Sequence, residues 1–438
     1  MLTFAIDTLG CKVNTYESQS YLASLKASGF QEVKFNEQAD IYIINTCAVT
    51  NTAAAKSRQR VNQAIKQNPH ALICVVGCLI QIGDEYLNND QDIDVLIGSS
   101  QKKMLVPLIQ QALKTKERQI FKQDVFDHPL FEDLQVESFE HQTRAFLKIQ
   151  DGCDQYCSYC IIPYARGKER SLAPQKVIQK AQTLSEKGHL EIVLSGIHTG
   201  RYGKEYQTDL EQLLQQLIMT SIKRLRISSI EINEVTDGII QLIKPYPVLA
   251  KHLHIPLQAG SDKILKAMRR PYDKAFYLKR VRFIKQQIPD ISISTDIIVG
   301  FPGESAEDFA ETFNFVKEVG FSFIHVFPYS KRTGTLAAKL DQQLTNAIKK
   351  QRVHELMDLS KIMYTKYQSR FIGETLEVLF ESKKDDYYYG HSSEYLPVKA
   401  KSFYDLRHKM YNVIIKETNE QELIGSVKEK IYETKSID

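Results

Sequence analysis

The sequence predicts an α/β protein with three parts: an N-terminal open parallel α/β domain, a central partial (β/α)6 barrel and a small C-terminal antiparallel β-barrel. Three observations predict it. Near the N-terminus, apolar runs end in turns and alternate with segments able to form helices. From residue 146 onward, six further apolar runs alternate with amphipathic stretches, and the last seventy or so residues contain five short strands. We expect domains over 1–115, 141–370 and 371–434, with 116–140 as a linker.

The three N-terminal apolar runs are each followed directly by a cysteine; they are LTFAIDTLG, ADIYIINT and ALICVVG. In an open parallel sheet, the residues beyond the carboxyl ends of the strands gather in one crevice. We therefore expect Cys11, Cys47 and Cys78 to converge on one three-cysteine metal site. Cys74 lies inside the third run, where a small buried residue is expected, and we assign it to packing.

The central region contains six strand candidates: FLKIQ, EIVLSGI, LRISSIE, LHIPLQ, ISISTDIIVGF and FSFIHVFPYS. A closed parallel barrel has eight strand–helix repeats, whereas this region has six. The sequence therefore predicts a barrel left partly open, with its site at the carboxyl ends of the strands. Polar residues and glycines stand at these ends. Taken singly, each is also explained as a satisfied polar group at the end of a strand, but as a set they indicate a binding site. They are Ser195, Gly196, Glu231, Gln258, Asp296 and Gly300.

Three more cysteines follow the first of these strands with the spacing C-x3-C-x2-C: Cys153, Cys157 and Cys160. Three thiolates on one loop hold three corners of a cubane iron–sulfur cluster and leave the fourth iron open. Tetrahedral zinc is the alternative, but it requires a fourth ligand, for which the loop offers only Asp151 and Asp154.

The formal net charge of the 438 residues is +4, distributed as −4 over 1–140, +11 over 141–370 and −3 over 371–438. A basic centre is able to meet a polyanion, although a solvated surface explains it equally well. The N-terminus has no basic segment of a secretory signal, and no run reaches about 18 apolar residues. An odd count of seven cysteines favours reduced, metal-binding thiols over disulfides. We expect a cytoplasmic protein with no membrane association.

The elements TLGCKVN, NTCAVT, GC and CDQYCSYCIIPYARGKERS resemble the methylthiotransferases, a branch of the radical S-adenosylmethionine (SAM) enzymes. The resemblance runs the whole length: an N-terminal cluster domain, a central radical SAM domain and a C-terminal TRAM domain of the OB-like kind, the last on YYYGHSSEYLPVKA. The KVN after Cys11 is closer to the branch that acts on threonylcarbamoyladenosine in tRNA than to the isopentenyladenosine branch, where QMN is usual.

The resemblance implies two 4Fe-4S clusters and SAM as cofactors. Cys153, Cys157 and Cys160 would hold the radical cluster, and Cys11, Cys47 and Cys78 an auxiliary cluster that carries the transferred sulfur. A 5′-deoxyadenosyl radical would take hydrogen from C2 of the adenine ring beside the anticodon. The SGIHTG segment would meet the methionine amino group, and IIVGFPGE would contact the adenine of SAM. Candidate cofactor-binding residues are Tyr159, Ser195, Gly196, Glu231, Gln258, Asp296 and Gly300.

The expected partners are tRNA, a reductant such as flavodoxin or ferredoxin, and a sulfur donor. Cationic side chains near the strand ends are able to pair with RNA phosphates or the cofactor carboxylate, and tyrosines of the last domain offer faces on which bases stack. The candidate RNA-binding residues are Arg166, Lys168, Arg170, Lys331, Arg332 and Tyr395.

Three alternatives stay open at this point. The same chemistry could act on isopentenyladenosine in tRNA, or on a ribosomal-protein aspartate as in a sister branch; the acidic C-terminal domain keeps the latter possible. A third reading is a non-catalytic iron–sulfur sensor that binds RNA, and the polar strand ends argue against it.

Overall fold

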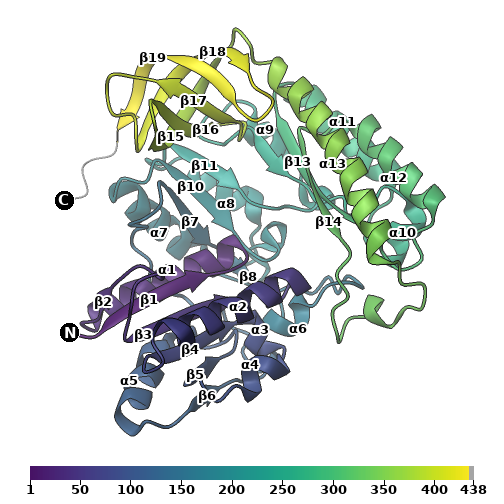
Figure 1. The fold of residues 1–438 in the computed structure, drawn as a ribbon. Helices are drawn as coiled ribbons and strands as arrows, with labels where there is room; N and C mark the ends of the chain where they lie inside the picture. The colour runs from purple at the N-terminus through teal and green to yellow at the C-terminus, as the bar shows by residue number, and fades with distance from the viewer. Residues whose placement is uncertain (434–438) are drawn as a thin grey trace.

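The structure, a computed structural model, describes residues 1–433. It consists of an N-terminal sheet, a central arc of parallel strands and a C-terminal barrel (Figure 1). Residue 434, the last of the predicted C-terminal domain, lies outside the described residues. Among the helices of the described part, none is both long and apolar enough to cross a membrane.

The N-terminal sheet has six parallel strands in the order β2-β1-β3-β4-β5-β6. They are β1 (Thr3–Thr8), β2 (Gln31–Glu32), β3 (Ile41–Thr46), β4 (Leu72–Gly77), β5 (Val95–Ile97) and β6 (Gln119–Phe121). The helices are α1 (Lys12–Ala27), α2 (Asn51–Gln67), α3 (Cys78–Gln81), α4 (Glu85–Asn89) and α5 (Leu105–Thr115). Alternate side chains of β3 face opposite cores, so that Ile41 and Ile43 pack with α1 and α5, whereas Tyr42 and Ile44 pack with α2. The predicted open parallel α/β fold is confirmed.

The segment predicted to be a linker, 116–140, belongs to the packed structure. Its residues 119–121 form β6, which pairs with β5 at the edge of the sheet. Farther along, Leu134, Val136 and Phe139 are buried in the core of the central region. The linker prediction is wrong because these apolar side chains complete two cores.

The central region contains two three-stranded parallel sheets in the orders β11-β10-β7 and β12-β13-β14. The strands are β7 (Arg144–Lys148), β10 (Glu191–Ser195), β11 (Arg224–Ile227), β12 (His252–His254), β13 (Ser292–Val299) and β14 (Phe323–Pro328). Single parallel bridges, Leu225 to Leu249 and Ser229 to His254, join the two sheets into one arc. Within the described residues no pairing closes β14 onto β7, so the predicted partial barrel is confirmed.

Helices cover the outer face of this arc (Figure 1). They are α7 (Pro174–Glu186), α8 (Leu210–Leu217), α9 (Asp237–Ile243), α10 (Asp262–Ala267), α11 (Lys274–Gln287), α12 (Ala306–Val319) and α13 (Asn346–Ser369). Between β7 and α7 lie the short strands β8 (Gln150–Asp151) and β9 (Arg170–Ser171) and the helix α6 (Ile162–Arg166). Ile161 and Ala165, at α6, pack into a core of the N-terminal sheet, which holds the cysteine loop against that region.

The C-terminal strands close into a barrel in the order β15-β16-β17-β19-β18. They are β15 (Thr375–Lys384), β16 (Tyr387–Ser392), β17 (Pro397–Lys401), β18 (Lys409–Thr418) and β19 (Leu423–Glu433). The prediction of an antiparallel barrel needs one correction, because β17 and β19 pair in parallel. All other neighbouring strands in the barrel are antiparallel.

Candidate active site

The N-terminal cysteines lie at the carboxyl ends of three adjacent strands. Cys47 and Cys78 directly follow β3 and β4, and Cys11 follows β1 after a turn through Gly10. Gly10 has φ +103°, and a Cβ on it would lie 2.8 Å from Cys47 Sγ, so only glycine lets the two loops approach this closely. The folding of a parallel sheet therefore brings these thiols to one crevice. Cys74 is fully buried inside β4, in the apolar core.

Burial shapes the chemistry of these thiols. It raises the pKa of Cys47, a buried thiol, to about 11. A buried thiol becomes a thiolate when a cation takes the place of its proton, which is what binding to an iron–sulfur cluster provides. The donor set of three sulfurs at one crevice therefore fits a cluster with one open iron.

Arg166 joins the N-terminal thiols to the central region. Its Nε donates to Cys78 Sγ at 3.2 Å, and its Nη atoms donate to Asn14 Oδ1 and Glu17 Oε1, each at 2.8 Å. It also lies 3.2 Å from Asp151, beside the second cysteine loop. Although burial opposes ionisation, Arg166 holds the pKa of Glu17 below its usual range.

The second cysteine trio, Cys153, Cys157 and Cys160, lies in the loop between β8 and α6, past the carboxyl end of β7. Burial raises the pKa of Cys160 to about 12. Arg270 Nη1 donates to Cys157 Sγ at 3.2 Å, and His198 Nδ1 lies 3.4 Å from Cys153 Sγ. Donors aimed at cysteine sulfurs tune the potential of an iron–sulfur cluster, so the surroundings of this loop suit one.

A cavity of about 690 Å³ opens beside Cys11 of the N-terminal trio. All three regions line it: Cys11 and Lys12 from the N-terminal region, the strand ends of the arc, and His391 and Tyr395 from the barrel. The predicted residues Ser195, Gly196 and Asp296 are on its wall. Ser195 Oγ is buried and has no hydrogen-bond partner among the described residues, which suits a bound polar ligand.

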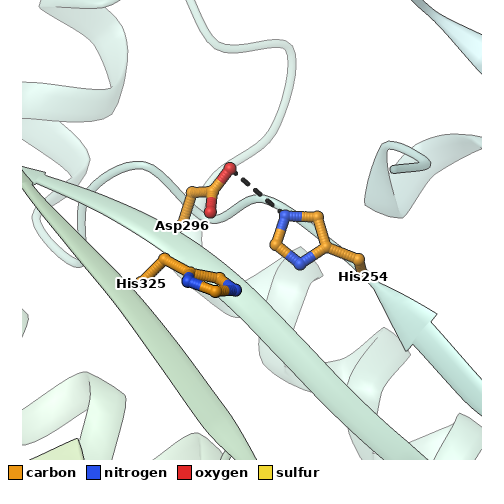
Figure 2. A group of neighbouring side chains, drawn as sticks. All are labelled: His254, Asp296 and His325. Atoms are coloured by element: carbon orange, nitrogen blue, oxygen red, sulfur yellow. Dashed lines mark ion pairs between the residues drawn. The ribbon is translucent and has the colours of Figure 1, made fainter. Parts of the chain in front are cut away.

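Histidines of two strands project into this cavity. Figure 2 shows His254 of β12 and His325 of β14 around Asp296 of β13, with His254 Nε2 3.2 Å from the Asp296 carboxylate. Ser294 Oγ lies 2.9 Å from His252 Nε2 and 2.9 Å from His254 Nδ1. The alternation of β12 places His252 and His254 on one face, toward the cavity.

A second cavity, of about 240 Å³, borders Cys160 of the second cysteine trio. Its walls include Tyr159, Cys160, Gln258 and Asp296, so Asp296 lies between the two cavities. Gln258 has φ +71°, an uncommon value for a residue with a Cβ. Its backbone N–H donates to the carbonyl of Asp296, and its own carbonyl accepts from the N–H of Ile298, both in β13. The structure thus brings Tyr159 and Gln258 together next to Cys160.

Two predicted cofactor residues do not line these cavities. Glu231 instead pairs with Arg270, the residue that donates to Cys157. Gly300 faces helix α13, because a Cβ on it would lie 2.4 Å from Lys349 Cγ. Its backbone N–H donates to Glu304 Oε2 at 2.5 Å. These contacts give Gly300 a packing role, and its direct contact with a ligand stays a prediction.

The predicted RNA contacts divide into buried and exposed side chains. Arg166 is 1% exposed and fully engaged by the contacts above. Arg170 is 6% exposed and donates to Asp151, and Arg332 is 8% exposed and donates to Asn51. For these three arginines a phosphate contact is wrong, because their guanidinium groups serve internal partners. Lys168 and Lys331 are exposed.

Tyr395 lies in the cavity wall, at the turn between β16 and β17. Its ring stacks with His252 and with His391, each at 5.0 Å between centroids. The guanidinium groups of Arg144 and Arg226 lie 5.3 Å and 4.8 Å from the ring centre. These four neighbours give the ring a role in shaping the cavity, and because Tyr395 is still 36% exposed, stacking of an RNA base on it stays a prediction.

Sequence reasoning missed His198, Arg270 and the histidines of β12. A signal was present for some of them. His198 stands in SGIHTG, three residues after the end of β10, and the pattern His-Leu-His in β12 puts two imidazoles on one face. Nothing in the sequence marks Arg270, since it lies between α10 and α11 in a basic run whose other cationic members are mostly exposed.

Comparison with known proteins agrees with this geometry. Residues 147–316 match the Radical SAM superfamily, and residues 3–98 match a family described as uncharacterized protein family UPF0004. A radical SAM methyltransferase, TsrM from Kitasatospora setae, shares the fold over 75% of both chains with a TM-score of 0.54 and 11% identity. The fold and the three-cysteine loop therefore define a radical SAM protein, whose class implies a 4Fe-4S cluster and SAM.

Two relatives show which family of radical SAM enzymes this chain belongs to. The threonylcarbamoyladenosine tRNA methylthiotransferase MtaB of Bacillus subtilis (strain 168) is 40% identical over 99% of both chains. The tRNA-2-methylthio-N(6)-dimethylallyladenosine synthase of Thermoanaerobacter pseudethanolicus is 35% identical over 88% of this chain and 83% of its own. This chain belongs to the methylthiotransferase family of radical SAM enzymes.

Proposed function

We propose that this protein converts N6-threonylcarbamoyladenosine beside the anticodon of tRNA to its 2-methylthio derivative. The relatives named for this activity are 35–40% identical to the chain over most of its length. The observation that carries the proposal is that two adjoining cavities share Asp296 and each has a cysteine of one trio on its wall: Cys11 in the cavity of about 690 Å³ and Cys160 in the cavity of about 240 Å³. A methylthio group has to be assembled at one centre and joined to a carbon activated at the other.

Cys153, Cys157 and Cys160 would hold the radical cluster, which with SAM would supply a carbon radical able to take hydrogen from C2 of adenine. The chain's part is to bind and orient. Tyr159, Gln258 and Asp296 would hold SAM next to Cys160, and Ser195 with Gly196 would meet its polar groups from the other side. Arg270 and His198 would hold the sulfurs of the cluster ligands by hydrogen bonds.

A second 4Fe-4S cluster, on Cys11, Cys47 and Cys78, would carry the sulfur to be methylated by SAM. Arg166, with its N–H on Cys78 Sγ, would stabilise the negative charge of that cluster. A reductant such as flavodoxin or ferredoxin would supply electrons, and a sulfur donor would restore the cluster. We propose that the reaction takes place in the cytoplasm, where these partners and tRNA are found.

The C-terminal barrel would act as a TRAM domain and hold the tRNA. Its five-stranded closed form suits an OB-like nucleic-acid binder. Lys168 and Lys331, both exposed near the ends of the arc strands, would contact phosphates. In this division residues 1–115, 141–370 and 371–434 form the three functional domains, with the segment between the first two packed against both.

Nucleoside mass spectrometry of tRNA from cells with and without this gene tests the substrate. We expect loss of the 2-methylthio nucleoside and accumulation of threonylcarbamoyladenosine. Loss of the isopentenyl derivative instead would retain the chemistry and reject the substrate. An unchanged tRNA profile would move the search to a ribosomal-protein aspartate.

Purified variants test the division of labour between the cysteines. Replacing Cys153, Cys157 and Cys160 by Ala should abolish reductive cleavage of SAM. Replacing Cys11, Cys47 and Cys78 should leave that cleavage intact but stop methylthio transfer. The control is Cys74→Ala, which should keep both activities because Cys74 lies in the core. Retention of methylthio transfer without the N-terminal trio would contradict the second cluster.

A further inference from the structure

Lys12 stands on the cavity wall, where no carboxylate of the described residues forms an ion pair with it. It follows Cys11 as the first residue of α1, and its side chain is exposed to the cavity of about 690 Å³. Within the described residues it takes part in no ion pair and no side-chain hydrogen bond. An ammonium group held at a binding cavity in this way is open to an anionic ligand.

The other cations near Lys12 already have carboxylate partners. Arg144 Nε lies 3.0 Å from Glu381 Oε1, and Arg226 Nε lies 2.7 Å from Glu191 Oε1. Both arginines stand over the ring of Tyr395, which shares the cavity wall with Lys12. The positive charge that remains uncompensated on this side of the cavity is therefore that of Lys12.

The proposed substrate has one group of matching chemistry. Threonylcarbamoyladenosine carries a free carboxylate on the threonine attached through N6 of adenine, whereas the isopentenyl group is neutral and apolar. In the adenine ring only N1 separates C2 from C6, so the N6 substituent lies close to the carbon that reacts. When C2 is placed near Asp296, between Cys11 of this cavity and Cys160 of the adjoining one, the threonine carboxylate comes within reach of the residues that adjoin Cys11.

We propose, on the basis of the proposed function, that Lys12 binds the threonine carboxylate of the substrate. It thereby selects this substrate against adenosines with neutral N6 substituents. A backbone phosphate is the other source of negative charge. The position of Lys12 beside Cys11, inside the cavity rather than on the outer surface, favours the carboxylate. A hydrogen bond from a charged donor to a carboxylate is strong enough to determine specificity.

The test uses anticodon stem-loops that carry either threonylcarbamoyladenosine or its neutral methylamide. We expect Lys12→Gln to lower kcat/KM on the acid by about 10- to 100-fold and to leave the amide nearly unaffected. Lys12→Arg, which keeps the charge, should restore most of the preference for the acid. Lys56→Gln, an exposed lysine of α2, is the matched control and should change neither substrate.

Iron content and SAM cleavage are measured on the same preparations, because Lys12 adjoins a cluster ligand. An equal loss on acid and amide would overturn the proposal and point to a phosphate contact. The proposal would also be overturned if the wild type showed no preference for the acid and Lys12→Gln only lost iron. If the wild type modifies neither stem-loop but binds the acid more tightly, and Lys12→Gln loses that difference, the carboxylate site stands and the proposed function fails.

Discussion

The guanidinium group of Arg166 contacts a sulfur of one cysteine trio and a carboxylate next to the other. We predict that Arg166→Met will destabilise the protein by about 3–5 kcal/mol, because Glu17 and Asp151 stay buried while losing a cationic partner. It should also reduce iron retention, since Cys78 loses its N–H donor. Thermal unfolding and iron analysis measure the two effects.

Lys168→Met is the control, two positions along the same segment. Lys168 is exposed, so its replacement should change stability by less than about 0.5 kcal/mol. Equal stability and iron content in the two variants would contradict the structural role assigned to Arg166.

The contrast between these residues shows what sequence reveals at this scale. The placement of the cysteines was predictable because each N-terminal one stands at the end of an apolar run, and the other three share one short loop. The burial of Arg166 was not, because its partner Glu17 is 149 positions away and sequence gives a side chain's charge without its surroundings. Arg170 and Arg332 were misjudged for the same reason.

At the scale of elements, the loop between β17 and β18 carries two exposed aromatic side chains. Phe403 and Tyr404 are fully and largely exposed, and exposed aromatic rings cost free energy unless a partner covers them. If the barrel holds tRNA, these rings are better placed to stack on bases than the buried Tyr388. We predict that Phe403→Ala with Tyr404→Ala weakens tRNA binding by about 1–3 kcal/mol per stacked base.

Fluorescence anisotropy with labelled tRNA measures this change. Met219→Ala, an 80% exposed residue after α8, is the control and should leave the affinity unchanged. If neither the double variant nor the control changes the affinity, tRNA does not contact this loop.

Element types were largely predictable, whereas some pairings were not. The six strands of the arc and the five of the barrel follow from alternation and turn residues. The parallel pairing of β17 with β19 was not predictable. The alternation of apolar and polar residues along a strand is the same whether its neighbour runs parallel or antiparallel. The strand β6 was missed because three residues, Gln119–Phe121, give too short a pattern.

Across the whole molecule, buried charges join the three regions. Glu17, Asp151 and Arg166 connect the N-terminal sheet to the arc. Arg224 connects the arc to the barrel: it pairs with Glu191 at 3.1 Å and Glu377 at 2.8 Å, and it donates to the backbone of the barrel. Separating the parts or shifting them would leave these buried charges without their partners, which is costly. The cavity between the three regions depends on both connections.

We therefore predict that breaking the second connection separates activity from cluster content. Arg224→Met should loosen the barrel, because Glu377 and the barrel carbonyls lose their donor, and should lower kcat/KM, since His391 and Tyr395 of the barrel line the cavity. Iron content should stay at the wild-type level, unlike in Arg166→Met. Limited proteolysis should show faster cleavage between α13 and β15.

Arg282→Met is the matched control, since its ion pair with Glu318 is exposed and such pairs contribute little. It should leave proteolysis, iron content and turnover unchanged. If Arg224→Met instead lost iron while its barrel stayed resistant to protease, the two connections would not be independent, and the cavity would have to be treated as one cooperative unit with the cluster sites.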